Sequence, residues 1–169
     1  WGEYLPWRPI LSKIGLARLV PGDYDFAPGP GPRTIVLPRF GAVGMLVCYE
    51  VIFSGNIVDP AHRPDFIFNP SNDSWYAVFG PEQHLAQARL RAIEEGLPII
   101  RATPTGISAI VDADGRIVAK TGWNQSTAIE APIPATHAPT LFARMGNWMA
   151  LIVAVLLGCS AVAIRRRAR

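Results

Sequence analysis

Cys48 is the residue of this 169-residue chain whose type and position best suit nucleophilic chemistry. It ends an apolar run, residues 42–48, that is typical of a buried strand, and Tyr49 and Glu50 follow it. Ligands bind at the carboxyl ends of strands in α/β folds, so a cysteine there can present its sulfur to a pocket. A thiolate is a good nucleophile once a base or a cation activates it. Taken alone, however, a cysteine here is more often a small buried hydrophobic side chain.

The other polar residues are weaker candidates. The three histidines share no element at metal-ligand spacing, and Cys48 and Cys159 lie in different environments, so neither a metal site nor a disulfide is expected. His84 falls on the polar side of its predicted helix, and a Cys48–His84 hydrolase is a weak alternative because nothing in the sequence fixes their proximity. Arg101 is expected to pair with a buried acid. No phosphate-binding glycine loop or dinucleotide fingerprint occurs, so no cofactor is expected.

Short apolar runs separated by turn residues indicate an α/β fold. The clearest helix covers residues 81–95, because Pro81 suits its first position and Gly96 ends it. A shorter helix is predicted over residues 50–58. Strands are predicted at residues 34–38, 42–48, 65–69, 97–102 and 128–133, with a hairpin of residues 108–111 and 116–119. The strands are apolar throughout rather than alternating, which predicts a sheet covered by helices.

One side of the predicted helix at residues 81–95 is broadly apolar and is expected to face the core. When successive residues are placed 100° apart around the helix axis, the residues on this side are Leu85, Ala86, Ala88, Leu90, Ala92 and Ile93. Arg89 falls in the middle of this side. A guanidinium on a packed face needs a partner, because an isolated buried charge is costly. The sequence does not name that partner.

An apolar run near the C-terminus, residues 148–164, predicts a membrane helix. It has no charge and no proline, and as a helix it spans about 25 Å, which is at the short end of what crosses a bilayer. A buried core helix is disfavoured because Ser160 is almost the only polar side chain in the run. The arginines at positions 165–169 predict a cytoplasmic C-terminus and a body on the opposite side. With no export signal at its start, the chain is expected to be the C-terminal piece of a longer protein.

Composition narrows the class of protein further. Hydrophobic residues make up 50% of the chain and charged residues only 17%, which excludes an intrinsically disordered protein. The net charge of +3 comes from the terminal arginines, and the rest of the chain is close to neutral. A nucleic-acid-binding domain would carry positive charge over a face or a helix, so nucleic acid is not an expected partner.

Five short motifs carry a resemblance when they are taken in order. They are CYE (48–50), SND with Trp75 (71–75), GPEQH (80–84), ARLRAIEEG (88–96) and RATPTG (101–106). In this order and spacing the chain resembles the nitrilase superfamily, and within it the membrane-bound apolipoprotein N-acyltransferases. The opening Trp1-Gly2-Glu3-Tyr4 is similar to the Phe-Gly-Glu-Tyr segment of that family. The resemblance covers residues 1 to about 125 and the terminal membrane helix.

This resemblance implies a four-layer α-β-β-α sandwich, present here in part, on the periplasmic side of a bacterial inner membrane. Cys48 would take an acyl chain from a phospholipid as a thioester, and the α-amine of a diacylglyceryl-cysteine lipoprotein would then attack it. The backbone N–H of Tyr49 would help to stabilise the oxyanion, and Glu3 and Glu50 match acidic positions that support the site. The implied division is a nitrilase-like domain (1–135), a linker (136–147), the membrane helix (148–164) and a cytoplasmic tail (165–169).

The chain also departs from the family pattern. The catalytic Glu and Lys of the family would both precede Trp1, so the 169 residues alone are expected to be inactive, and Pro104 replaces a usual Asn. One alternative is a membrane-tethered amidase of the same superfamily, in which water replaces the lipoprotein amine. Another is a tethered binding module in which Cys48 is inert. Without the resemblance, Glu3 would be a surface carboxylate and Glu50 an acid in the first turn of a helix.

Overall fold

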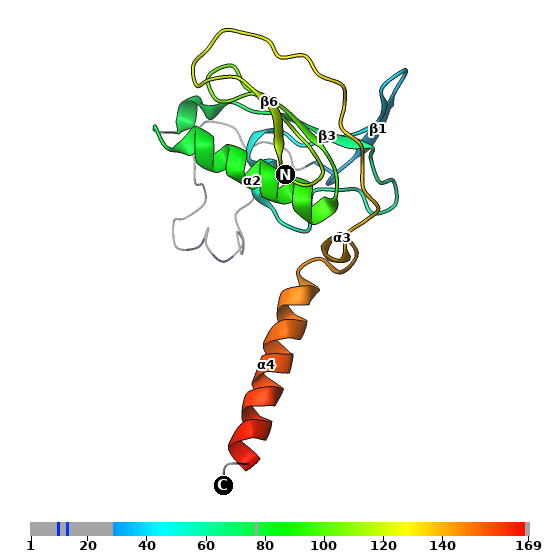
Figure 1. Cartoon of the computed structure of the whole chain (residues 1–169), viewed down its shortest axis with the longest axis vertical. Helices are drawn as coiled ribbons and strands as arrows, with labels where there is room; N and C mark the ends of the chain where they lie inside the picture. The colour runs from blue at the N-terminus through cyan, green and yellow to red at the C-terminus, as the bar shows by residue number, and fades with distance from the viewer. Residues whose placement is uncertain (1–9, 11–12, 14–28, 77, 168–169) are drawn as a thin grey trace.

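The computed structural model describes residues 10, 13, 29–76 and 78–167 (Figure 1). Glu3 and the other opening residues therefore lie outside the described part of the chain. The elements, in order, are β1 (Thr34–Leu37), β2 (Gly41–Met45), the 3-10 helix η2 (Cys48–Ile52), β3 (Phe66–Pro70), the 3-10 helix η3 (Asp73–Trp75), α2 (Gly80–Glu95), β4 (Ile99–Ala102), β5 (Ala109–Val111), β6 (Ile117–Lys120), α3 (Leu141–Met145) and α4 (Trp148–Arg167).

The six strands form one mixed sheet in the order β1-β2-β3-β4-β5-β6. Its centre is parallel: Gly44 of β2 pairs with Ile67 of β3, and Ile67 pairs with Ile99 of β4. The flanking pairs, β1 with β2, β4 with β5 and β5 with β6, are antiparallel. Because β2, β3 and β4 run in the same direction, their carboxyl ends lie at one edge of the sheet, where α/β proteins place their sites.

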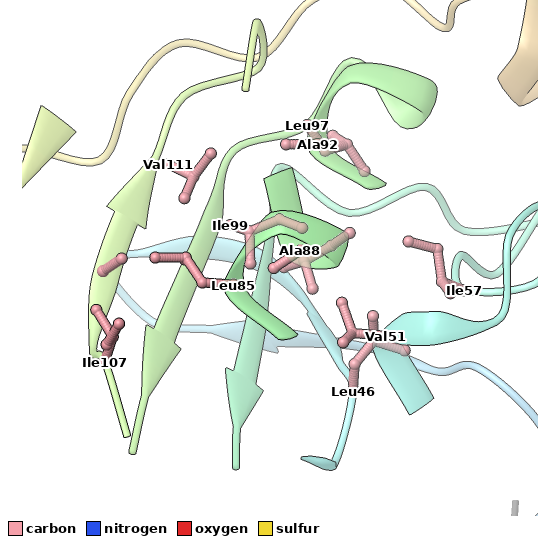
Figure 2. Packing of buried hydrophobic residues seen from close by; sticks show 12 residues of the cluster. Leu46, Val51, Ile57, Leu85, Ala88, Ala92, Leu97, Ile99, Ile107 and Val111 are labelled. Atoms are coloured by element: carbon pink, nitrogen blue, oxygen red, sulfur yellow. The ribbon is translucent and has the colours of Figure 1, made fainter. Parts of the chain in front are cut away.

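Helix α2 connects β3 to β4 and covers one face of the sheet, so the described residues supply one strand layer and one helix layer (Figure 1). The hydrophobic core lies between them, and Leu85, Ala88 and Ala92 of α2 face apolar side chains from the strands (Figure 2). Ile67 of β3 and Ile99 of β4 are fully buried in this cluster. The expected α/β class is thus confirmed, and the alternation of strand, helix and strand accounts for the parallel centre.

The boundaries of α2 agree with the prediction, but its buried face does not. The helix ends at Gly96, whose φ of 66° is left-handed and whose N–H donates to the carbonyl of Ala92. Arg89, expected on the packed side, is exposed, and its Nε donates to the carbonyl of Gly115 at 2.8 Å. Arg91, by contrast, is buried.

The buried face of α2 is therefore rotated toward polar positions. Its members are Pro81, His84, Leu85, Ala88, Arg91, Ala92 and Glu95. Leu90 and Ile93, which were expected in the core, are about half exposed. The prediction of the buried face was wrong because the face that packs on the sheet carries three polar side chains, each of which has partners within the domain. Hydrophobic periodicity alone could not identify it.

Three other predicted elements need correction. The strand at 42–48 ends at Met45, and Cys48 begins the next element. The helix expected at 50–58 is only the short 3-10 helix η2. Residues 128–133 form no strand. In each case a short apolar run was assigned more regular structure than it has, because such runs do not distinguish strand, helix and irregular packing.

The segment 136–147 is attached to the domain by hydrogen bonds at several points and contains the unexpected helix α3. The backbone N–H of His137 donates to the carbonyl of Gly96 at 3.0 Å, and the hydroxyl of Thr140 donates to the carbonyl of Glu94. Asn147 Nδ2 then donates to the carbonyl of Ser54 at 3.1 Å. The start of α4 is therefore fixed against the domain by specific contacts.

Helix α4 points away from the domain (Figure 1). The stretch Trp148–Arg166 is long and apolar enough to cross a membrane, with a mean hydropathy of 2.1 and no part of it buried. A helix of 20 residues is about 30 Å long, which matches the hydrocarbon core of a bilayer. An exposed helix with no polar face fits lipid better than water.

Candidate active site

Cys48 lies at the point where the chain leaves β2 and turns into η2. Its φ is +52°, a left-handed conformation that is uncommon for a residue with a side chain and costs about 1–2 kcal/mol. The turn is closed by Glu50, whose Oε2 accepts a hydrogen bond from the N–H of Val47 at 2.7 Å. The Cys48 side chain is partly exposed, and Sγ lies 3.9 Å from the carbonyl oxygen of Asn72. The nucleophile candidate is thus held in a strained turn and is partly exposed rather than buried in the core.

Asn69, the fourth residue of β3, fixes this turn from the neighbouring strand. Its side chain is fully buried, and Nδ2 donates to the carbonyls of Leu46 at 2.8 Å and Cys48 at 3.1 Å. The same amide therefore binds the backbone on both sides of the turn. Hydrogen bonds of this kind can hold a strained backbone conformation, because releasing the turn would leave buried polar groups without partners.

A buried arginine continues the network on the far side of Asn69. Arg101 Nη1 donates to Asn69 Oδ1 at 2.6 Å and to the hydroxyl of Ser71 at 2.9 Å. Its Nη2 donates to both carboxylate oxygens of Asp73, at 2.7 and 2.8 Å. The side chains of Arg101 and Asp73 are both fully buried, so each depends on the other for compensation of its charge.

His84 completes the network from α2. Its Nδ1 lies 2.9 Å from Asp73 Oδ1, which can only accept, and 2.9 Å from Arg101 Nη2, which can only donate. Burial raises the pKa of Asp73, but the hydrogen bonds from His84 and Arg101 outweigh this effect and hold its pKa below the ordinary value. Asp73 is therefore ionised. The expectation that Arg101 pairs with a buried acid is confirmed, with Asp73 as the acid.

A small pocket of about 250 Å³ lies between the end of η2 and the start of α2. It is lined by Ile52, Tyr76, Gly80, Gln83, His84 and Gln87. The Tyr76 ring packs edge-on against the His84 ring, with centroids 5.4 Å apart. Burial, and then the nearby charges of Cys48 and Asp73, raise the pKa of Tyr76. Tyr76 therefore stays neutral and packs against the His84 side of the buried network.

The residues predicted from the sequence are only partly brought together. Cys48, Tyr49 and Glu50 share η2, where the Tyr49 ring packs edge-on against Phe53 at 5.8 Å between centroids. Glu50 closes the turn, which agrees with its reading as an acid of the first turn and leaves its role in the reaction untested. His84 was expected on a polar helix side but is buried against Asp73.

Sequence reasoning missed Asn69. The only signal was an asparagine placed directly after a buried apolar strand, and that position is equally common before a turn. No group of three His, Cys, Asp or Glu side chains that could hold a metal ion is found within the described ranges.

Comparison with known proteins identifies the family to which this arrangement belongs. A model of the carbon-nitrogen hydrolase family matches residues 9–140. An apolipoprotein N-acyltransferase of Rhodopseudomonas palustris is 40% identical over 158 residues, which cover 93% of this chain and 30% of that protein. One of Bradyrhizobium diazoefficiens is 39% identical, with 99% and 31% covered.

This chain thus spans about a third of the length of the curated relatives that it matches. Among solved structures, the NitN amidase of Nesterenkonia sp. AN1 aligns with a TM-score of 0.48 and 18% identity, covering 82% of this chain and 52% of that one. The family model covers most of the chain, including the Cys48 turn and the whole buried network. The chain belongs to the carbon-nitrogen hydrolase family.

Proposed function

We propose that this chain provides the nucleophile of an N-acyltransferase that acts on lipoproteins. The observation that carries the proposal is the Cys48 turn, in which a partly exposed thiol is held in a left-handed conformation at the carboxyl end of a parallel strand. The names of the relatives support the choice of reaction. An inert structural cysteine would need neither the strain nor the buried network that supports it.

In the first step the Cys48 thiolate attacks the ester carbonyl of a phospholipid. A carbon–sulfur bond forms, the ester carbon–oxygen bond breaks, and the lysophospholipid alkoxide leaves with a proton. In the second step the α-amine of a diacylglyceryl-cysteine lipoprotein attacks the thioester. A carbon–nitrogen bond forms, the thiolate leaves, and the nitrogen loses a proton. The two steps need a base and a positive group near the carbonyl oxygen.

We propose that a Glu and a Lys of the whole protein supply those groups, as the resemblance to the family implies. Glu3, Tyr49 and Glu50 are proposed to support the site, with the N–H of Tyr49 directed at the oxyanion. Helix α4 would anchor the domain in the inner membrane, with the domain in the periplasm and the terminal arginines in the cytoplasm, so that a lipid donor can reach Cys48.

The proposal is tested by the intact mass of the protein extracted from its native membranes, measured before and after hydroxylamine. We expect an acyl adduct that hydroxylamine removes and that maps to the Cys48 peptide, together with loss of the adduct in a Cys48→Ala variant. Adding a diacylglyceryl-cysteine peptide should move the acyl group to its amine. Release of free fatty acid instead would indicate an amidase-like hydrolase, and absence of any adduct would favour the tethered binding module.

A further inference from the structure

The C-terminal end of η2 is held by polar side chains from α2, much as its N-terminal end is held by Asn69. Arg91 Nη1 donates to the carbonyl of Ile52, the last residue of η2, at 3.0 Å. Arg91 Nη2 donates to one carboxylate oxygen of Glu94 at 2.6 Å, and the other oxygen accepts the hydroxyl of Ser54 at 2.9 Å. One ion pair on α2 is thus bonded to the chain at and just beyond the end of η2.

The same stretch of chain is bonded to the residue that precedes α4. Asn147 Nδ2 donates to the carbonyl of Ser54 at 3.1 Å. Gly55 follows with a left-handed φ of 72°, and Asn147 packs against the turn that this glycine makes. We give the name junction clasp to Arg91, Glu94, Ser54 and Asn147, because these residues join α2 and the end of η2 to the start of α4.

Without Asn147, the connection to α4 would pass through a glycine that has few restraints. Gly146 follows α3 with a φ of 55°, and among the described residues no atom beyond its chain neighbours lies within 4 Å of the position that a Cβ would take. His137 and Thr140 bond the segment before α3 to the C-terminal end of α2, so they do not restrain Gly146 itself. Asn147 is therefore the contact that is placed to fix the direction of α4 relative to η2.

We propose that Asn147 is a positioning residue, which sets the position of Cys48 relative to the membrane through the junction clasp. Cys48 begins η2, and the five residues of this 3-10 helix, at about 2 Å each, place it about 10 Å from the clasped end. Val51, between the two ends, is fully buried in the core, so η2 and the domain move as one unit. Asn147 acts through this unit and does not touch the thiol.

A fixed position of Cys48 matters because the ester of a phospholipid lies at the boundary between headgroups and hydrocarbon. Trp148, which follows Asn147 directly, is exposed, and tryptophan is typical of this boundary. The junction clasp therefore joins the element of the nucleophile to a residue at the depth of the donor ester. The inference rests on the acyl transfer and the membrane placement of α4 proposed above, because a donor dissolved in water would need no such restraint.

The test compares two acyl donors on the whole protein in phospholipid nanodiscs. Phospholipid in the bilayer gives the hydroxylamine-labile adduct on Cys48, and water-soluble p-nitrophenyl butyrate acylates the same thiol with release of p-nitrophenolate. Asn147→Ala and Asn147→Asp both remove the hydrogen bond to Ser54, and each should slow acylation by phospholipid about fivefold, the factor that one neutral hydrogen bond is worth. The rate with p-nitrophenyl butyrate should change by less than about twofold.

Asn56→Asp is the matched control. Asn56 is exposed and lines the same cavity of about 570 Å³ as Asn147, so the substitution places the same charge at the same junction. It should leave both rates within about twofold of those of the unmodified protein.

A second measurement does not depend on acyl transfer. A bimane group is attached to Cys48 in a background whose other cysteines are replaced by serine, and spin-labelled lipid headgroups in the nanodisc quench its fluorescence. In both Asn147 variants the quenching should fall by about half, because the clasped arrangement is then less populated. In Asn56→Asp it should stay unchanged.

An equal loss of rate with both donors would show that Asn147 acts on the fold or on the thiol itself, and an equal effect of Asn56→Asp would show a general effect of charge at the membrane surface. Either result overturns the proposal, as does unchanged quenching in both Asn147 variants. If the whole protein forms no adduct from phospholipid, acyl transfer is refuted, and the quenching alone decides whether Asn147 positions Cys48. Failure to enter nanodiscs would contradict the membrane placement of α4 and, with it, this inference.

Discussion

Replacing Asn69 by Ala should both destabilise the domain and misplace Cys48. The substitution removes the two hydrogen bonds to the carbonyls of Leu46 and Cys48 and the two that Asn69 Oδ1 accepts from Ser71 and Arg101. A neutral buried hydrogen bond contributes about 1 kcal/mol and one to a charged group about 2 kcal/mol. The free energy of unfolding should therefore fall by about 5 kcal/mol, measured by denaturation of the detergent-solubilised protein.

The functional effect of this variant should exceed its effect on folding. Without the amide, Cys48 is free to relax from its φ of +52° to an ordinary conformation, which moves the sulfur. A displacement of about 1 Å at a reacting atom can cost about 10²-fold in rate. We therefore expect the rate of hydroxylamine-labile acylation at Cys48 to fall by about 10²-fold under conditions in which the variant is still folded.

Ser71→Ala provides a matched control for Asn69→Ala. The Ser71 hydroxyl is also buried and bonds both Asn69 and Arg101, at 3.1 and 2.9 Å, but it does not touch the Cys48 turn. It should cost about 1–2 kcal/mol in stability and slow acylation by less than threefold. If both variants slow acylation equally once the unfolded fraction is subtracted, the amide of Asn69 does not position the nucleophile, and the reasoning is refuted.

Three further predictions follow from the same contacts. Cys48→Gly should stabilise the fold by about 1 kcal/mol, since glycine adopts a positive φ without strain, and it should abolish acylation. A glycine variant that is less stable would show that the Cys48 backbone is not strained. Because the pKa of Asp73 is lowered on folding, its stabilising effect is present above its unfolded pKa and declines as the pH falls through its folded pKa. In Asp73→Asn, the free energy of unfolding should therefore fall less steeply as the pH is lowered through the acid range, measured by denaturation at a series of pH values. Arg91→Ala should destabilise the domain more than Arg89→Ala does, by at least about 1 kcal/mol in the same assay. The reverse order would show that Arg89, as hydrophobic periodicity predicts, lies on the packed face of α2.

Local sequence signals were sufficient to predict most of the secondary-structure elements. Pro81 and Gly96 set both ends of α2 because each acts through its own backbone conformation. The hairpin around Asp114-Gly115 and the apolar segment of α4 were likewise visible in short windows. These features depend on neighbours in the sequence, so they can be read without knowing the tertiary structure.

The candidate site was less predictable because its supporting contacts join distant strands. Asn69 and Arg101 are 32 residues apart in sequence, and Cys48 is 21 residues from Asn69. The resemblance to a family pointed to Cys48, but it did not show that a buried asparagine holds its carbonyl. The prediction of which face of α2 is buried was wrong for the same reason, since His84 and Arg91 are buried by partners that no local pattern reveals.

The order of strands explains why a strained cysteine can persist here. Three parallel strands end at one edge of the sheet: Cys48 follows β2, Asn69 lies on β3 and Arg101 on β4. Each strand thus contributes one member of a chain of hydrogen bonds that runs from the Cys48 carbonyl to the Arg101 guanidinium. The strain of about 1–2 kcal/mol at Cys48 is smaller than the cost of breaking this buried network, which includes an ion pair worth about 3–5 kcal/mol to disrupt. The parallel centre of the sheet therefore does more than form the core: it brings together the groups that keep the thiol in a conformation that an isolated turn would not hold.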